Sequence, residues 1–210
     1  MEGPLLVVAG PGSGKTRTII CRIAHLIRVC GVSPWRIAAV TFTNKAAREM
    51  RERLASVISQ TADDVTVGTF HSSCARALRR DGSSIGLDSE FAIYDDPDQL
   101  DLFKRSMKEL DIDPKRFSPR AVQSAISSAK SILLGVEGFT LRRETYWDEI
   151  VSRVYERYED LLTQSSGVDF DDLLMKTYFL FEKFPEVAGK NQTRYVHLMI
   201  DEYQDTNVAQ

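Results

Sequence analysis

Residues 5–16 constrain the fold of this chain more than any other stretch. They read LLVVAGPGSGKT: four apolar residues, a glycine-rich turn, then Lys15 and Thr16. The apolar run predicts a strand buried on both faces, and the apolar spacing that follows predicts a helix over 16–29. A strand, a glycine-rich turn and a helix in this order form a phosphate-binding loop, because backbone amides and the helix dipole both favour an anion there.

The spacing of this P-loop assigns roles to individual residues. Ala9 occupies the first position of G-x-x-x-x-G-K-[ST], where glycine is usual, and this is the one departure from the pattern. Lys15 is predicted to reach the β- and γ-phosphates, and the Thr16 hydroxyl to ligate Mg²⁺. We therefore predict that the chain binds a nucleoside triphosphate. The predicted loop residues are Gly10, Pro11, Gly12, Ser13, Gly14, Lys15 and Thr16.

Length and composition narrow the class of protein. A chain of 210 residues can form one large domain or two modest ones. No apolar run approaches the roughly 20 residues of a membrane span, and no cleavable leader is visible. Cys21, Cys30 and Cys74 contain no C-x-x-C pair, so we expect buried free thiols in a reducing compartment, with the cytoplasm as the location.

Charge is distributed unevenly along the chain. The first 80 residues hold 12 Lys and Arg against 5 Asp and Glu, whereas the remaining residues hold 15 against 25. A basic first segment beside the P-loop is compatible with a polyanionic partner, although most surface charge only solvates a protein.

Further apolar runs predict buried strands at 37–41, 65–69 and 196–200, with helical patterns between them. Such alternation predicts an α/β fold with a parallel sheet covered on both faces. The middle of the chain is acidic and predicted to be nearly all helix, so we interpret it as a helical insertion. Asn44 and Asp169 are predicted helix caps, and Thr145 with Asp148 resembles a capping box. The expected division is 1–90 for the first part of the α/β domain, 91–165 for the insertion, and 166–210 for the return to the α/β domain.

Two carboxylates follow the last predicted strand. In P-loop ATPases an acidic residue at a strand end beside the P-loop helps to hold Mg²⁺, and Asp201 fits that position. Glu202 is placed to accept a proton from the water that attacks the γ-phosphate. Ligands bind at the carboxyl edge of open α/β sheets, which favours this interpretation over a charged loop that merely ends a strand.

Hydroxyls and aromatic rings follow the second and third predicted strands, in TFTNK and GTFH. Hydroxyls and helix amides suit phosphate contacts, and rings suit base stacking. The alternative is that Phe42 and Phe70 belong to the core and the threonines are helix caps, which composition alone favours. His71 has no second His or Cys at metal-ligand spacing. The candidate nucleic-acid contacts are Thr41, Phe42, Thr43, Asn44, Thr69, Phe70 and His71.

Four motifs together carry a family resemblance. AGPGSGKT, TFTNKAAREM, VGTFH and DEYQDTN resemble motifs I, Ia, Ib and II of superfamily 1 DNA helicases of the UvrD/PcrA/Rep group. The resemblance implies a RecA-like P-loop NTPase sheet with an inserted helical subdomain. The same resemblance implies ATP- and Mg²⁺-dependent 3′-to-5′ movement on single-stranded DNA or at a single-strand/duplex junction, in repair or replication. It also implies that Arg17 lies near the nucleotide base and that Gln204 helps to position water or the γ-phosphate.

The sequence also departs from that family's pattern. The glutamine motif that precedes the P-loop is absent, as are the second RecA-like domain and its arginine fingers, each worth about 10³–10⁵ in rate. We therefore expect a fragment that binds Mg-ATP weakly and hydrolyses it very slowly without the C-terminal half of the same helicase. Three alternatives stay open: the helicase portion of a recombination helicase-nuclease, a truncated nucleotide- or DNA-binding module without turnover, and a small-molecule kinase, against which Asp201-Glu202 followed by Gln204 argues.

Overall fold

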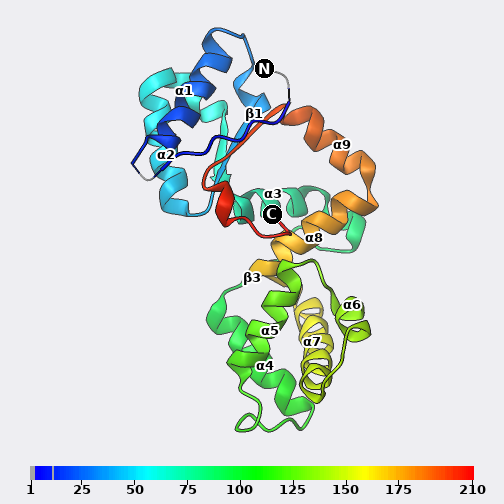
Figure 1. The fold of residues 1–210 in the computed structure, drawn as a ribbon. Helices are drawn as coiled ribbons and strands as arrows, with labels where there is room; N and C mark the ends of the chain where they lie inside the picture. Colours follow the sequence, from blue (N-terminus) through cyan, green and yellow to red (C-terminus); the bar gives the residue numbers. More distant parts are fainter. Residues whose placement is uncertain (1–2, 11) are drawn as a thin grey trace. The chain divides into compact units, whose positions relative to one another are not determined.

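The computed structural model describes residues 3–10 and 12–210. The chain divides into two compact units (Figure 1). The first, here called the sheet unit, runs to Phe70 and also contains 189–205. The second, here called the helical unit, contains 71–188 and 206–210.

Three parallel strands form the sheet of the sheet unit. They are β1 (Ile37–Thr41), β2 (Thr66–Thr69) and β5 (His197–Ile200), in the order β2-β1-β5. Val40 of β1 is in register with Gly68 on one side and with Ile200 on the other. The carboxyl ends of all three strands therefore meet at one edge, and the predicted parallel α/β sheet is confirmed.

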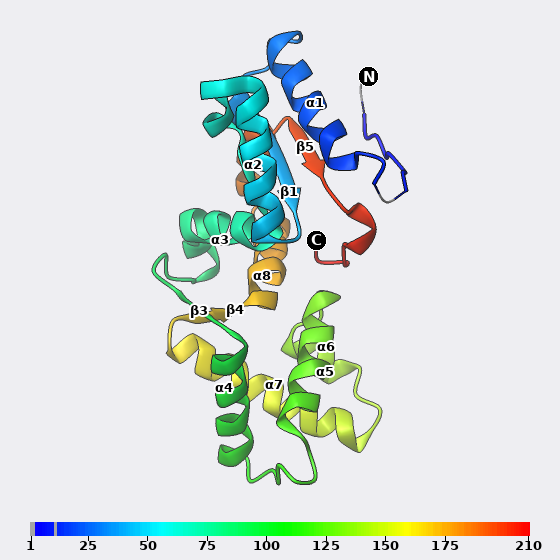
Figure 2. The same ribbon diagram turned by 90° about the vertical axis from the view of Figure 1, so that its left-hand side faces the viewer.

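Two helices cover this sheet: α1 (Lys15–Arg28) and α2 (Asn44–Ile58). Figure 2 shows them beside β1 and β5. Apolar residues recur every three or four positions in each helix, so one face of each is buried. Ile23 of α1, Leu54 of α2 and Ile37 of β1 are completely buried in one shared core. Short 3-10 helices at 34–36 and 59–64 complete the connections, and α9 (Pro185–Arg194) leads into β5.

The first predicted strand does not form. Leu5, Leu6, Val7 and Val8 are 55–87% exposed and have no strand partner among the residues described. Apolar character favours burial, but a strand also needs a neighbour for its backbone hydrogen bonds. Of the described strands only β1 pairs with β5, and Leu198 of β5 is 59% exposed. The prediction of a strand over 5–8 is therefore wrong, and β5 is less buried than predicted.

The helical unit contains most of the remaining helices. Figure 2 shows α4, α5 and α7 as neighbours, and they share one core with α6. A second core joins α3 to α8. A short parallel ladder of β3 and β4 was not predicted from the sequence. The bounds are α3 (Phe70–Asp81), β3 (Ala92–Tyr94), α4 (Asp96–Glu109), α5 (Pro119–Ser131), α6 (Val136–Leu141), α7 (Tyr146–Gln164), β4 (Gly167–Asp169) and α8 (Phe170–Lys183).

Side-chain caps begin several of these helices. Thr145 and Asp148 form a reciprocal capping box at α7, and Asp169 caps α8, both as the sequence predicts. At α2 the structure corrects the prediction by one residue. Thr43, not Asn44, is the N-cap, because its Oγ1 accepts a hydrogen bond of 3.0 Å from the Ala46 amide.

The sequence predicts buried free cysteines and no membrane span. Cys21 and Cys30 are exposed and Cys74 is partly buried, and all three are free thiols. The expected burial is wrong for the first two, because both lie outside the apolar stripe that α1 presents to the core. Within 3–10 and 12–210, no helix combines the length and apolarity needed to cross a membrane.

Candidate functional site

The glycine-rich turn leads directly into α1. Gly12 and Gly14 have φ values of +73° and +88°, in the left-handed region that favours glycine. The amide and the hydroxyl of Ser13 both donate to the carbonyl of Gly10, at 3.3 and 2.6 Å. Gly14 is the N-cap, and no side chain in the described part of the chain caps α1. The first amides of the helix are thus directed at a position suited to an anion. Pro11 lies outside the described residues.

Thr16 and Asp201 come together beside this turn. The Thr16 Oγ1 donates a hydrogen bond of 3.1 Å to Oδ2 of Asp201, which is only 7% exposed. Lys15 folds back over the turn, and its Nζ donates to the Ala9 carbonyl at 3.3 Å. Arg17 is exposed in the first turn of α1. A hydroxyl and a carboxylate oxygen are ligands that Mg²⁺ prefers, so the residues present fit the predicted metal.

Glu202 is the next residue at this edge of the sheet. The Asp201 amide donates to the Val40 carbonyl at 2.9 Å, which extends the pairing of β5 with β1 by one residue. Glu202 then takes a φ of +52°, a conformation that is uncommon outside glycine. Its side chain is exposed, and Gln204 Nε2 donates a hydrogen bond of 2.6 Å to its Oε2. The carboxylate predicted to be a base is therefore bonded to the amide predicted to assist it.

The threonines at the strand ends are engaged close to their own backbone. Thr41 and Thr69 are 2% and 6% exposed. Thr41 Oγ1 accepts a hydrogen bond of 3.3 Å from the Thr43 amide, and the Thr43 hydroxyl caps α2. Asn44 is exposed as the first residue of that helix. These positions lie at the carboxyl ends of β1 and β2, as predicted, and the hydroxyls of Thr41 and Thr43 bond to nearby backbone amides.

Two edge-to-face aromatic pairs lie at the start of α3, one in each unit. In the sheet unit, the rings of Phe42 and Phe70 are 5.6 Å apart, and both side chains are partly exposed. In the helical unit, His71 lies 5.6 Å from Phe170, which is 45% exposed. Burial lowers the pKa of His71, which favours the neutral ring. Sequence reasoning missed Phe170, because one aromatic residue after a helix cap carries no local signal of exposure.

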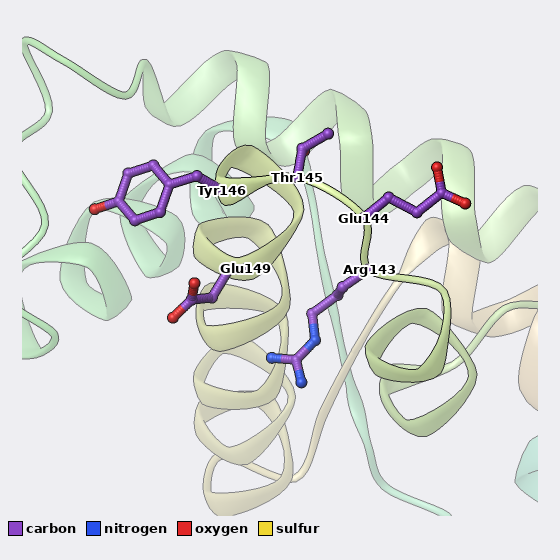
Figure 3. A pocket seen from close by; sticks show the side chains of 5 residues that line it. All are labelled: Arg143, Glu144, Thr145, Tyr146 and Glu149. Atoms are coloured by element: carbon purple, nitrogen blue, oxygen red, sulfur yellow. The ribbon is translucent and has the colours of Figure 1, made fainter.

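A shallow hollow of about 480 Å³ lies elsewhere, at the start of α7. Its lining residues are Arg143, Glu144, Thr145, Tyr146 and Glu149. Figure 3 shows that Tyr146 and Glu144 point in opposite directions, so the polar groups do not converge on one position. It contains no residue of the four motifs that carry the family resemblance, and the candidate site residues lie at the sheet edge instead.

The motifs at the sheet edge agree with a comparison of the whole sequence. The sequence model of the family described as "UvrD/REP helicase N-terminal domain" matches residues 1–210. The chain belongs to this family. Among curated proteins, it is 49% identical over 209 residues to "ATP-dependent DNA helicase PcrA" of Bacillus subtilis (strain 168), and 48% identical over 210 residues to the protein of that name from Leuconostoc citreum.

This member of the UvrD/REP N-terminal family corresponds to only part of those relatives. The alignments cover 100% of the chain but 28% of each of the two relatives. A third, "ATP-dependent DNA helicase PcrA" of Staphylococcus aureus (strain Mu50 / ATCC 700699), is 44% identical over 209 residues, which is 29% of its length. The chain thus spans less than a third of the curated relatives it matches.

Proposed function

We propose that the chain is the ATP- and DNA-binding N-terminal part of an ATP-dependent 3′-to-5′ DNA helicase or translocase of the UvrD/Rep type. The family match and the printed names of the relatives support this proposal. In this proposal the fold is a RecA-like P-loop NTPase sheet, from 1–90 and 166–210, that carries a helical subdomain at 91–165. The parallel sheet and the helix-rich middle of the chain support that division.

The observation that carries the proposal is the hydrogen bond between Thr16 and Asp201. It joins the end of the P-loop to the end of β5, which is the arrangement that a P-loop ATPase uses to bind a metal-nucleotide complex. Thr16 and Asp201 would hold Mg²⁺, and Lys15 with the turn amides would bind the phosphates. When bound, Mg²⁺ would neutralise charge that develops on the phosphate oxygens.

Glu202 and Gln204 would act on the attacking water. The Glu202 carboxylate is exposed at the carboxyl edge of the sheet, so a water molecule can reach it. It would accept a proton from that water while Gln204 holds its Oε2. The left-handed backbone at Glu202 supports a functional assignment, because strained backbone conformations cluster at active sites and ligand-binding sites.

Single-stranded DNA would bind at the starts of α2 and α3. The candidates are Thr41, Phe42, Thr43, Asn44, Thr69, Phe70 and His71, to which the structure adds Phe170 beside His71. Base stacking on an exposed ring contributes about 1–3 kcal/mol per base. A single-strand/duplex junction, a role in repair or replication and a cytoplasmic location belong to the same proposal.

One alternative has a specific observation in its favour. The chain covers 28% of its relatives, which is also compatible with a module that binds nucleotide and DNA without turnover. The helicase portion of a helicase-nuclease would contain the same motifs. The following experiment separates turnover from binding.

Phosphate release tests the proposal. The chain is assayed with ATP and Mg²⁺, with and without a thymidine oligonucleotide, alone and mixed with the remaining C-terminal portion of the Bacillus subtilis relative. We expect little release by the chain alone and DNA-stimulated release in the mixture. Glu202→Gln should abolish the gain, whereas Glu156→Gln, at an exposed glutamate of the helical unit, should retain it. Brisk release by the chain alone would contradict the proposed incompleteness, and binding without stimulation would favour the module.

A further inference from the structure

A lysine lies completely buried inside the helical unit. Lys130 of α5 has a side chain that is 0% exposed. Its Nζ forms ion pairs with Asp169 Oδ2 at 2.7 Å and with Asp172 Oδ1 at 2.8 Å. A third ion pair joins it to Glu159 Oε1 at 2.5 Å. Its partners come from α7, from the end of β4 and from α8, so one ammonium group connects three elements to α5.

The charges around Lys130 nearly balance. Lys176 also contacts two of the carboxylates, Glu159 at 3.3 Å and Asp172 at 3.2 Å. These five residues, here called the Lys130 cluster, contain two cations and three carboxylates. Burial lowers the pKa of Lys130, but the carboxylates of Asp172, Asp169 and Glu159 outweigh it and hold that pKa well above its usual value. The ammonium is therefore charged at any ordinary pH.

Asp169 is the member of the Lys130 cluster that begins a helix. It is the N-cap of α8, and its Oδ1 accepts a hydrogen bond of 2.7 Å from the Asp172 amide. Its Oδ2 accepts bonds from Lys130 at 2.7 Å and from the Tyr158 hydroxyl at 2.9 Å. Both carboxylate oxygens are thus occupied. Three buried donors from three elements fix where α8 begins and how its first turn is oriented.

Phe170 is the next residue along the chain. It is the first residue of α8, and its half-exposed ring lies against His71 of the same unit. Phe170 directly follows the cap residue Asp169, so the position of its backbone depends on the contacts that Lys130 and Tyr158 make with Asp169. A change that releases Asp169 would let the first turn of α8 move, and the ring would move with it.

We propose that Lys130 is a positioning residue for single-stranded DNA binding: through Asp169 it holds Phe170 beside His71 in the orientation that receives a base. The inference rests on the proposed function, since it takes the His71–Phe170 pair as part of the DNA surface. It also assigns the buried charges a role beyond stability, because they connect the helices of this unit to an exposed aromatic contact.

The test uses the 210-residue chain and a fluorescein-labelled thymidine oligonucleotide, with anisotropy as the readout. Phe170→Ala should weaken binding by roughly 5- to 150-fold, the range that corresponds to one stacked base. Asp169→Asn removes the charge that Lys130 contacts but keeps a residue that caps helices equally well, so the helix should survive. We expect it to weaken binding several-fold while affinity for a fluorescent ATP analogue, which reports on the sheet unit, stays unchanged.

A double-mutant cycle separates positioning from general destabilisation. If Lys130 acts through Phe170, then Lys130→Met should weaken DNA binding in the wild-type background and add almost nothing to Phe170→Ala. Lys176→Met makes the same charge change in the cluster without a contact to Asp169, and should leave DNA affinity unchanged. If Lys130→Met does not fold, Asp169→Asn combined with Phe170→Ala supplies the same cycle.

The outcomes distinguish the two proposals. Additive effects, or unchanged affinity in Asp169→Asn while Phe170→Ala weakens binding, would overturn the positioning role and leave the proposed function intact. If the wild-type chain does not bind the oligonucleotide, or Phe170→Ala binds as the wild type does, the DNA surface itself is wrongly placed. A parallel loss of ATP-analogue affinity would mean that Asp169→Asn acts by general destabilisation, which also overturns the positioning role.

Discussion

Thr16 and Asp201 are separated by 185 residues in the sequence, yet the Thr16 Oγ1 lies 3.1 Å from Asp201 Oδ2. Parallel pairing of β5 with β1 brings the end of β5 to the edge of the sheet that the P-loop also reaches. The hydroxyl and the carboxylate that sequence motifs assign to Mg²⁺ are therefore in direct contact in the folded chain.

Asp201→Asn should weaken binding of the Mg²⁺–nucleotide complex. The amide removes the negative charge that would face the metal but preserves the size of the side chain. We expect a fluorescent ATP analogue to lose at least about tenfold in affinity with Mg²⁺ present, equivalent to ~1.4 kcal/mol, and to lose little in EDTA. Asp63→Asn, at an exposed position of the sheet unit, is the matched control. Equal losses with and without Mg²⁺ would argue against metal ligation by Asp201.

Gln204→Ala should reduce turnover without weakening nucleotide binding. Its side-chain amide contacts Glu202 rather than the P-loop, so its removal frees the proposed base without disturbing phosphate contacts. When the chain is mixed with the C-terminal portion of the Bacillus subtilis relative, we expect the variant to show a lower kcat for phosphate release and an unchanged KM for ATP. Glu202→Gln should lower kcat further, by about 10²–10⁴, the usual contribution of a general base. Gln192→Ala, on the exposed face of α9, should match the wild type, and a raised KM in Gln204→Ala would place Gln204 on the nucleotide instead.

Tyr158→Phe should destabilise the helical unit. The Tyr158 hydroxyl donates to the buried Asp169 carboxylate at 2.9 Å, and burial raises the pKa of Tyr158. Its ring stacks on Phe103 with centroids 4.0 Å apart, and phenylalanine keeps that stacking. A hydrogen bond to a charged group contributes about 1.5–3 kcal/mol, which is the expected loss in free energy of unfolding by urea. Tyr178→Phe, whose hydroxyl is exposed, should cost less than about 0.5 kcal/mol.

The Asp96–Arg120 contact should make stability depend on pH. Hydrogen bonds from Arg120, at 2.7 and 2.8 Å, lower the pKa of Asp96 from 3.8, and Gln123 adds to the effect. A carboxyl group whose pKa is lower in the folded state contributes stability above its unfolded pKa and loses it as pH falls through its folded pKa. Acidification below about pH 4 should therefore cost the wild type more than Arg120→Ala. Urea unfolding at pH 6 and pH 3 measures this difference, with Arg153→Ala as the control that should retain the full dependence.

Local patterns in the sequence predicted much of this chain. The alternation of apolar runs with helical spacing predicted the parallel α/β sheet, and short cap motifs predicted the starts of α7 and α8. These signals succeed because caps and helical faces depend on residues within one or two turns of each other. The P-loop and DEYQDTN motifs likewise indicated the family, which the whole-chain comparison confirms. The roles of individual site residues stay predictions that the experiments above address.

Tertiary structure decided the rest. The apolar segment 5–8 has the composition of a strand, but pairing requires a neighbour that composition does not specify. The exposure of Phe170 beside His71 depends on how α3 and α8 pack. In the sequence, Lys130 has the pattern of an ordinary surface lysine near the end of an amphipathic helix. Its partners Asp169 and Asp172 lie 39 and 42 residues away along the chain. Ion pairs between residues this far apart leave no repeating pattern in the sequence, so only the folded structure shows which charged groups come together.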